Sequence, residues 1–261
     1  MEITNLVRPR TIDEAYRYLT EKNATLIGGG AWLRMSPRKI DTAVDLSSLA
    51  LRYIRNDGDR IEVGAMATVR DVETSSLLEG AFGPLFRNAV GHIVGVQMRN
   101  VLSVGGTVAG RYGFSDLNTV LLALNAHVCL YKAGKVDFAD FLSGGNRGPF
   151  LIEKIVLDAG RGAFQSIRNT RQDLPILNAA AAISGGSWRI AVGARPGPSR
   201  LAANAAEVLG TAARPEAAVI EKAAAIAAGE ISFRGDIRAT ADYRQSVCAT
   251  LVRRAITEVV A

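Results

Sequence analysis

A chain of 261 residues, 48% hydrophobic and 21% charged, can bury more than one core, since ~100–200 residues is usual for a domain. No apolar run approaches the ~18–20 residues of a spanning helix, and the N-terminus lacks the apolar segment of a secretion signal, so we expect a cytoplasmic protein without a membrane span. The net charge of +6 comes from scattered basic residues without interleaved aromatic ones, which argues against nucleic-acid binding.

The two cysteines, Cys129 and Cys248, lie far apart in the sequence. They provide neither a disulfide framework nor the ligands of an iron–sulfur cluster. The two histidines, His92 and His127, are too few and too separated for a metal site. Metal chemistry, if the protein takes part in any, must therefore belong to a partner.

A helix is predicted at "TIDEAYRYLTEKNA" (11–24), where Thr11 and Glu14 form a capping box ahead of apolar residues at helical spacing. Short strands are expected at "ATLIGG" (24–29) and "TAVDLSSL" (42–49). Residues 51–56 and 60–64 flank an Asn-Asp-Gly-Asp turn, which predicts an antiparallel hairpin.

Residues 68–94 are predicted to be helical, with a break near Gly83–Pro84. A turn and a loop are expected at the second glycine cluster, "LSVGGT" (102–107). Ser115 or Asp116 then caps an apolar helix at 117–125. Residues 127–142 are typical of a hairpin followed by a short helix.

The composition changes near residue 159, which we take as a domain boundary. Beyond it we expect a strand near 163–168, an alanine-rich helix at 173–183 and a strand at "WRIAVGA" (188–194). Further helices are predicted near 200–209, 215–228 and 239–259.

Two glycine clusters, "LIGGGAWL" (26–33) and "LSVGGT", each follow an apolar segment. Glycine permits positive φ and a close approach to the backbone, and successive backbone N–H groups in such turns bind anions. Neither cluster has the dinucleotide-binding GxGxxG pattern or a P-loop. A tight turn is the simplest explanation of either cluster alone, whereas the two together could hold a diphosphate from both sides.

Four ordered segments resemble a known family, the medium, FAD-binding subunits of the molybdenum hydroxylases, the group of xanthine dehydrogenase and carbon monoxide dehydrogenase. They are "VRPRTIDEAYRYLTEKNATLIGGGAWL", "IEVGAMATVRDVE", "MRNVLSVGGTVAGRYGFSDLNTVLLALNA" and "RGDIRATADYRQSVCATLVRRAI". The resemblance covers nearly the whole chain.

The resemblance implies an α+β fold. Residues 1–159 would form a two-lobed FAD-binding domain of the vanillyl-alcohol-oxidase (PCMH) type, with lobes of about 1–50 and 51–159, and residues 160–261 a C-terminal α+β domain of the CO dehydrogenase flavoprotein type. It also implies a large molybdenum-cofactor subunit and a small [2Fe–2S] subunit as partners. The flavin would pass electrons from these clusters to an external acceptor, so the cofactor carries the chemistry.

The resemblance assigns residues to FAD. Backbone N–H groups of the first loop would hold the pyrophosphate, the second loop would approach from the other side with the Ser103 hydroxyl, and Asp116 would accept hydrogen bonds from ribityl or ribose hydroxyls. Phe164 would lie against the isoalloxazine ring. The full set of expected cofactor contacts is Leu26, Ile27, Gly28, Gly29, Gly30, Ala31, Trp32, Gly64, Ala65, Leu102, Ser103, Gly105, Gly106, Thr107, Asp116, Ile152 and Phe164, with no catalytic or metal-binding residue.

Alternatives remain for several of these residues. Asp116 could be a helix cap and Phe164 a core side chain. Arg99 and Asn100 are expected to brace the second loop, and Tyr243 and Arg244 to hold the C-terminal helix. The first loop departs from the family pattern, since Ala31 and Trp32 stand where short polar side chains are usual. A flavin-free structural subunit, or less plausibly an independent flavin oxidase, is therefore an alternative function.

Overall fold

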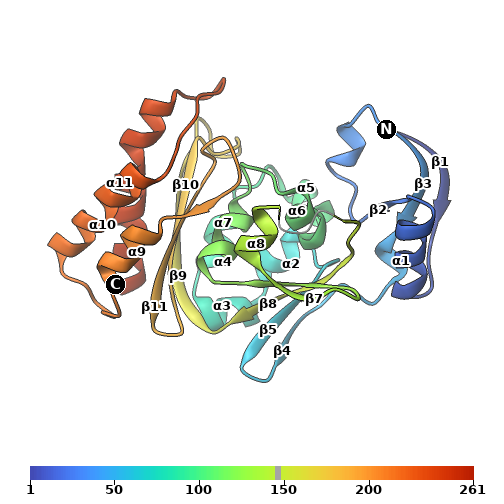
Figure 1. Ribbon diagram of the computed structural model, residues 1–261, viewed down its shortest axis with the longest axis horizontal. Helices are drawn as coiled ribbons and strands as arrows, with labels where there is room; N and C mark the ends of the chain where they lie inside the picture. Colours follow the sequence, from blue (N-terminus) through green and yellow to red (C-terminus); the bar gives the residue numbers. More distant parts are fainter. Residues whose placement is uncertain (145–147) are drawn as a thin grey trace.

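The computed structural model describes residues 1–144 and 148–261 and shows three parts in a row (Figure 1). The N-terminal lobe, drawn in blue, contains a parallel sheet in the order β1-β3-β2. Its elements are β1 (Glu2–Val7), α1 (Ile12–Glu21), β2 (Thr25–Ile27), the 3₁₀ helix η1 (Leu33–Met35), β3 (Lys39–Asp45) and the 3₁₀ helix η2 (Leu46–Ser48).

The predicted N-cap of α1 is confirmed, but the reciprocal bond of the capping box goes to Arg10 and not to Thr11 itself. The Thr11 hydroxyl accepts a hydrogen bond from the N–H of Glu14, and the Glu14 carboxylate accepts one from the N–H of Arg10. Ala15 on the inner face of the helix packs into a small core with Val44 and Leu46. This core fixes β2, and therefore the start of the first glycine loop, against α1.

The middle part is built on a second sheet, in the order β4-β5-β8-β6-β7, with all its strand pairs antiparallel. The predicted hairpin is confirmed as β4 and β5, and the predicted helical stretch is broken at Gly83–Pro84. The strands are β4 (Ile54–Asp57), β5 (Arg60–Gly64), β6 (His127–Leu130), β7 (Gly134–Asp137) and β8 (Ile152–Asp158), and the helices are α2 (Val69–Thr74), α3 (Ser76–Phe82), α4 (Leu85–Val90), α5 (Val96–Val101), α6 (Val104–Gly110), α7 (Asp116–Ala123) and α8 (Phe138–Leu142).

The second glycine cluster was expected to be a turn and a loop, and this prediction is wrong. Residues 104–110 form α6, whose N-cap is Ser103, with the Ser103 hydroxyl accepting a hydrogen bond from the N–H of Gly106. Glycines are tolerated in this helix because it packs against Ala65, and a Cβ on Gly105 would stand 2.8 Å from the Ala65 Cβ. Tertiary packing thus outweighs the poor helix propensity of glycine.

The C-terminal part is a four-stranded antiparallel sheet, β12-β11-β10-β9, covered by long helices drawn in orange and red (Figure 1). Its elements are β9 (Gly160–Ile167), β10 (Leu177–Ser184), β11 (Ser187–Gly193), β12 (Arg200–Leu201), α9 (Ala203–Leu209), α10 (Ala217–Glu230) and α11 (Ala241–Val260). The three predicted helices after residue 200 are confirmed, with small shifts in their ends.

The alanine-rich helix predicted at 173–183 is wrong, because "LNAAAAIS" is strand β10. It pairs antiparallel with β9 on one side and β11 on the other. Ala180 and Ala182 face the core of the middle part, while Ala179 and Ala181 face α11 and the core that it forms with α9 and α10. Alanine favours helices in isolation, but here small side chains let a strand lie between two helical layers.

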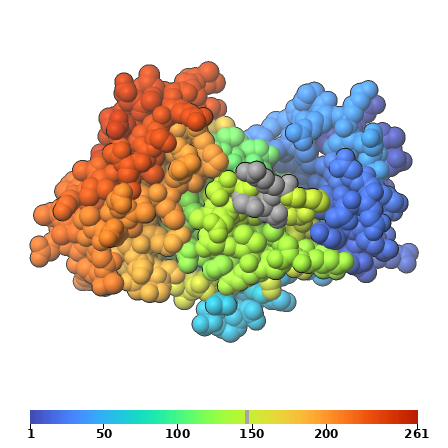
Figure 2. Space-filling model, in the orientation of Figure 1, coloured from blue at the N-terminus to red at the C-terminus, as the bar shows by residue number. Residues whose placement is uncertain are grey.

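The space-filling view shows the three parts in contact along the chain's long axis (Figure 2). Phe164 and Ala180 of the C-terminal sheet belong to the same hydrophobic core as Leu85 and Leu121 of the middle part. No helix within residues 1–144 and 148–261 has both the length and the apolar character needed to span a membrane.

Candidate functional site

Two adjoining cavities lie between the N-terminal lobe and the middle part. The first, the loop cavity, measures about 240 Å³ and is lined by both glycine segments: Leu26, Gly28, Gly29, Gly30, Ala31, Trp32, Leu33, Leu102, Ser103, Gly106, Thr107, Ala109, Gly110 and Tyr112. The second, the lobe cavity, measures about 450 Å³ and is lined by Leu19, Ala24, Thr25, Leu26, Gly28, Arg38, Leu46, Ala65, Met66, Ser103, Gly105, Gly106, Ala109, Gly148, Pro149, Phe150 and Ile152. They share Leu26, Gly28, Ser103, Gly106 and Ala109, so together they form one elongated site.

The three consecutive glycines are required by close contacts at two positions and by the backbone conformation at the third. A Cβ on Gly29 would overlap the carbonyl oxygen of Val101, and a Cβ on Gly28 would overlap the Ser103 hydroxyl. Gly30 has a backbone φ of +66°, which residues other than glycine rarely adopt. The first loop can therefore lie directly against the segment that leads into α6.

This packing leaves backbone donors of the first loop free. Among the described residues, no hydrogen bond is formed by the N–H groups of residues 29–33. In contrast, the N–H groups at the start of α6 are used within the protein: Val104 donates to the Ala67 carbonyl oxygen and Gly105 to the Ala65 carbonyl oxygen, both at 2.8 Å. The first loop, and not the second, offers a row of donors to an anion.

Ser103 lies at the junction of the two cavities and is buried. Its hydroxyl accepts from the Gly106 N–H at 3.2 Å, and its own proton has no acceptor among the described residues. A hydroxyl in this state can still donate to a ligand oxygen.

The electrostatics of the site suit a negatively charged ligand. No acidic side chain of residues 1–144 and 148–261 lines either cavity, whereas Arg38 lines the lobe cavity. Free N–H donors, a hydroxyl with an available proton and a nearby cation are the groups that bind phosphate. The residues present therefore fit the pyrophosphate of FAD, the cofactor that the sequence resemblance implies.

Most of the predicted contact residues lie around this site, but four do not. Ile27 and Gly64 line neither cavity; a Cβ on Gly64 would overlap the Leu51 carbonyl oxygen, so this glycine serves strand packing. Phe164 is 5% exposed in the core of the middle part, which supports the alternative of a core aromatic side chain. As FAD contacts, these residues remain untested predictions.

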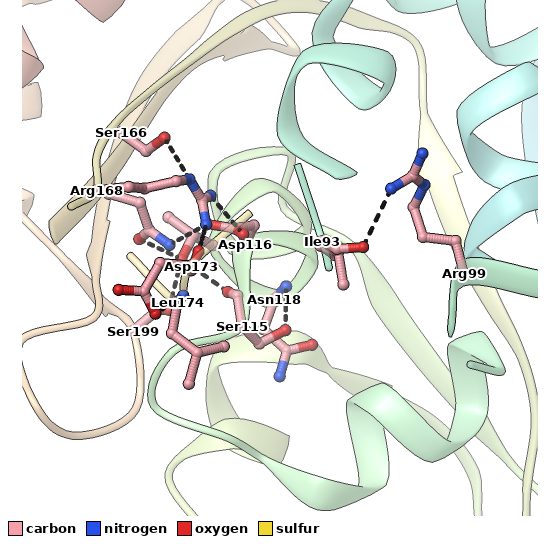
Figure 3. A network of polar contacts seen from close by, with 12 residues as sticks. Ile93, Arg99, Ser115, Asp116, Asn118, Ser166, Arg168, Asp173, Leu174 and Ser199 are labelled. Carbon is pink, nitrogen blue, oxygen red and sulfur yellow. Dashed lines mark hydrogen bonds and ion pairs between the residues drawn. The ribbon is translucent and has the colours of Figure 1, made fainter. Parts of the chain in front are cut away.

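Asp116 is the fourth, and Figure 3 shows it inside a polar network that joins the middle part to the C-terminal sheet. Its carboxylate accepts hydrogen bonds from Arg168 at 2.7 Å and from the Asn178 amide at 2.8 Å. Burial raises the pKa of Asp116, and the Arg168 guanidinium opposes that shift. The cap of α7 is Ser115, whose hydroxyl accepts from the N–H of Asn118.

Arg168 is the centre of this network (Figure 3). Besides Asp116, it donates to the Asp173 carbonyl oxygen at 2.8 Å and to the Ser166 hydroxyl at 3.3 Å. A small pocket of about 30 Å³ lies beside it, lined by Trp32, Ile93, Val94, Leu102, Thr107, Tyr112, Phe114, Ser115, Asp116, Arg168, Asp173 and Leu174. This pocket shares Trp32, Leu102, Thr107 and Tyr112 with the loop cavity, so the network lies next to the candidate site.

The sequence reasoning missed Tyr112 and Phe114. Their ring centroids are each 5.3 Å from that of Trp32, and the two rings stack on each other at 5.3 Å with an interplanar angle of 14°. A signal was present, because "AGRYGFSD" carries two aromatic residues where the family resemblance suggests small ones.

Arg99 and Arg244 brace the structure as predicted, whereas the same prediction for Asn100 and Tyr243 is wrong, because both are exposed and neither side chain forms a hydrogen bond within residues 1–144 and 148–261. Arg99 is buried and donates to the Glu73 carboxylate at 2.7 Å and to the Ile93 carbonyl oxygen at 3.1 Å, which fixes α5 just before the second glycine segment. Arg244 holds the start of α11 through carbonyl oxygens and Asp236.

Comparison with known proteins gives matches over nearly the whole chain. Residues 2–157 match the FAD binding domain in molybdopterin dehydrogenase, and residues 162–259 match the CO dehydrogenase flavoprotein C-terminal domain. The nicotine 6-hydroxylase medium subunit of Paenarthrobacter nicotinovorans is 28% identical over 96% of this chain and 95% of its own. The glyceraldehyde dehydrogenase medium chain of Sulfolobus acidocaldarius is 25% identical over 97% of each.

Solved structures show the same fold. CO dehydrogenase from Oligotropha carboxidovorans superposes with a TM-score of 0.88 at 24% identity, covering 100% of this chain and 98% of that one. Quinoline 2-oxidoreductase from Pseudomonas putida 86 gives a TM-score of 0.88 at 21% identity, over 100% and 97%. The predicted α+β fold is thereby confirmed, and the chain belongs to the family of FAD-binding medium subunits of the molybdenum hydroxylases, which are oxidoreductases.

Proposed function

We propose that this chain binds FAD in the elongated site and serves as the electron-transfer subunit of a multi-subunit molybdenum-containing hydroxylase or dehydrogenase. It would receive electrons from [2Fe–2S] clusters on a small partner subunit, with the molybdenum cofactor on a large one, and deliver them to an external acceptor. The unpaired N–H groups of residues 29–33, which line the loop cavity together with Ser103, carry this proposal.

In this proposal the first loop holds the pyrophosphate by its backbone and Ser103 donates its hydroxyl proton. The apolar side chains of the lobe cavity, among them Leu19, Leu46 and Phe150, exclude water from one of the two ring systems of FAD. FAD, when bound, supplies the redox chemistry, and the chain's own residues bind and orient it.

The two cysteines support the assignment of the metal centres to partners. Cys248 is buried in the core between the C-terminal sheet and α11, where burial raises the pKa of its thiol to about 12. Cys129 lies on β6, and burial raises the pKa of its thiol as well. No cluster of metal-ligating side chains occurs in the part of the chain that the structure describes.

The proposal is tested by the absorption spectrum of the purified chain after incubation with FAD and gel filtration. We expect retained flavin bands, with FAD bound one to one. The Ser103→Ala variant should bind FAD about tenfold to a hundredfold more weakly, because one hydrogen bond to a charged oxygen contributes about 1.5–3 kcal/mol. Ser103→Thr keeps the hydroxyl and should bind as the wild type does.

A folded chain that stays colourless at saturating FAD would contradict the proposal and would favour the flavin-free structural subunit. Electron transfer is then tested in the assembled complex, where reduction through the partner subunits should bleach the flavin bands of this chain. Substrate turnover by the isolated chain would instead indicate an independent flavin oxidase.

A further inference from the structure

We propose that Trp32 and Tyr112, which line the loop cavity and pack against Phe114, form a stacking wall for the isoalloxazine ring of FAD. We call these three rings the aromatic wall. This inference rests on the proposed function and adds to it the side chains that select and position the ring system.

The aromatic wall is shared between two parts of the molecule. Trp32 comes from the first glycine loop of the N-terminal lobe, and Tyr112 and Phe114 come from the connection between α6 and α7. Trp32 and Tyr112 both line the loop cavity, together with the residues 29–33 whose N–H groups are free. The same cavity therefore offers donors for a phosphate and aromatic faces for a ring attached to it.

The connection that carries Tyr112 and Phe114 has a fixed shape. A Cβ on Gly110 would overlap the Tyr112 ring, so this glycine makes room for the ring to fold back over the end of α6. The Gly113 carbonyl oxygen accepts from the Ala194 N–H at 2.8 Å, and a Cβ on Gly113 would stand 2.8 Å from the Gly197 carbonyl oxygen. The rings are thus held in place by backbone contacts with the C-terminal part.

The polar atoms of the Trp32 and Tyr112 rings are available to a ligand. Neither the Trp32 indole N–H nor the Tyr112 hydroxyl has a hydrogen-bond partner among residues 1–144 and 148–261. Both residues are only partly buried. Each presents an aromatic face together with a free polar group, which matches a flat ring system with a polar edge.

The two ends of the elongated site differ in their side chains, one aliphatic and one aromatic. This difference can distinguish the adenine of FAD from its isoalloxazine ring system. The lobe cavity is walled mainly by aliphatic side chains such as Leu19, Leu46 and Met66. The loop cavity ends at the electron-rich rings of Trp32 and Tyr112. Because isoalloxazine is the more electron-poor ring system, it gains more from contact with indole and phenol faces than adenine does.

The test compares bound-flavin fluorescence and FAD affinity in the full chain. An indole or phenol in contact with excited flavin quenches its emission by donating an electron, which returns when the pair recombines. The Trp32→Phe/Tyr112→Phe variant keeps ring shape but removes both donors, so its bound flavin should emit severalfold more strongly than that of the wild type. The matched control, Trp188→Phe/Tyr243→Phe, changes the same residue types in the C-terminal part and should leave the emission unchanged.

Affinity provides the second measurement. Trp32→Ala removes the ring and should raise the Kd for FAD about fivefold to tenfold. Unchanged emission in the Trp32→Phe/Tyr112→Phe variant, or tighter FAD binding by Trp32→Ala, would overturn the inference while the proposed function stands. A wild-type chain that takes up no FAD would overturn the proposed function and this inference with it.

Discussion

Arg244 shows how much a single buried charge contributes to this fold. Its side chain is fully buried, and its guanidinium donates to the carbonyl oxygens of Ile176, Arg234 and Ala239 at 2.7–2.8 Å and to Asp236 at 2.5 Å. It therefore joins α11 to β10 and to the loop before the helix. The family resemblance pointed to this arginine, but its full set of partners comes from segments that only the folded chain brings together.

We expect Arg244→Ala to lower the free energy of unfolding by about 3 kcal/mol, because the carbonyl oxygens that it binds lose their donor and the fully buried side chain is removed from its packing. Urea unfolding followed by circular dichroism measures the change. Arg253→Ala, on the same helix, breaks an ion pair with Glu221 in which both side chains are largely exposed, and should cost less than about 1 kcal/mol. Equal effects of the two substitutions would refute the structural role given to Arg244.

Trp32 is the residue whose surroundings the sequence indicated least. From the sequence it stood where a short polar side chain was expected, with no indication of its surroundings. The structure places it against Tyr112 and Phe114, whose positions depend on Gly110 and Gly113. Contacts between residues 80 positions apart cannot be read from local pattern, since they depend on how the lobes meet.

Strand β10 is the element in which local propensity and tertiary structure disagree. Four consecutive alanines favour a helix, yet both edges of the segment are occupied by neighbouring strands and both faces by helices. The two-faced burial removes the alternation that identifies a strand in sequence. Alanine serves here because its small side chain lets α7 and α11 approach the sheet.

Ala181→Leu should therefore destabilise the protein by about 1–3 kcal/mol, because the added atoms enter a closely packed layer between β10 and α11. The same substitution at Ala218, which is exposed on α10, should change stability by less than about 0.5 kcal/mol. Thermal or urea unfolding of both variants makes the comparison. A neutral Ala181→Leu would mean that this layer has room for larger side chains.

At the scale of the whole molecule, the C-terminal sheet connects two cores. One face of β9 and β10 packs with the helices of the middle part, and the other packs with α9, α10 and α11 (Figure 1). The sheet cannot lose its structure without exposing both cores. The middle and C-terminal parts should therefore unfold together, even though the sequence matches divide them into two domains.

The two tryptophans allow this to be measured. In the Trp188→Phe variant, the emission of Trp32 reports on the loop packed against the core of the middle part. In the Trp32→Phe variant, the emission of Trp188 reports on the core between the C-terminal sheet and its helices. In each variant we expect the urea midpoint from tryptophan emission to coincide with that from circular dichroism, as for a single cooperative transition. Separate midpoints would show that the two cores unfold independently.

The sequence by itself determined the α+β class, the family, most helices and strands, and the two glycine segments that line the site. These features depend on local signals: an N-cap at Thr11, a turn at Asn56–Asp59, and two clusters of glycine that each follow an apolar segment. Only the tertiary structure decided that 104–110 is a helix and 177–184 a strand, that Asp116 is held by Arg168, and that Trp32 meets Tyr112. The reason is physical: these outcomes depend on burial, close approach of backbones and ion pairing between distant segments, which exist only once the lobes have packed together.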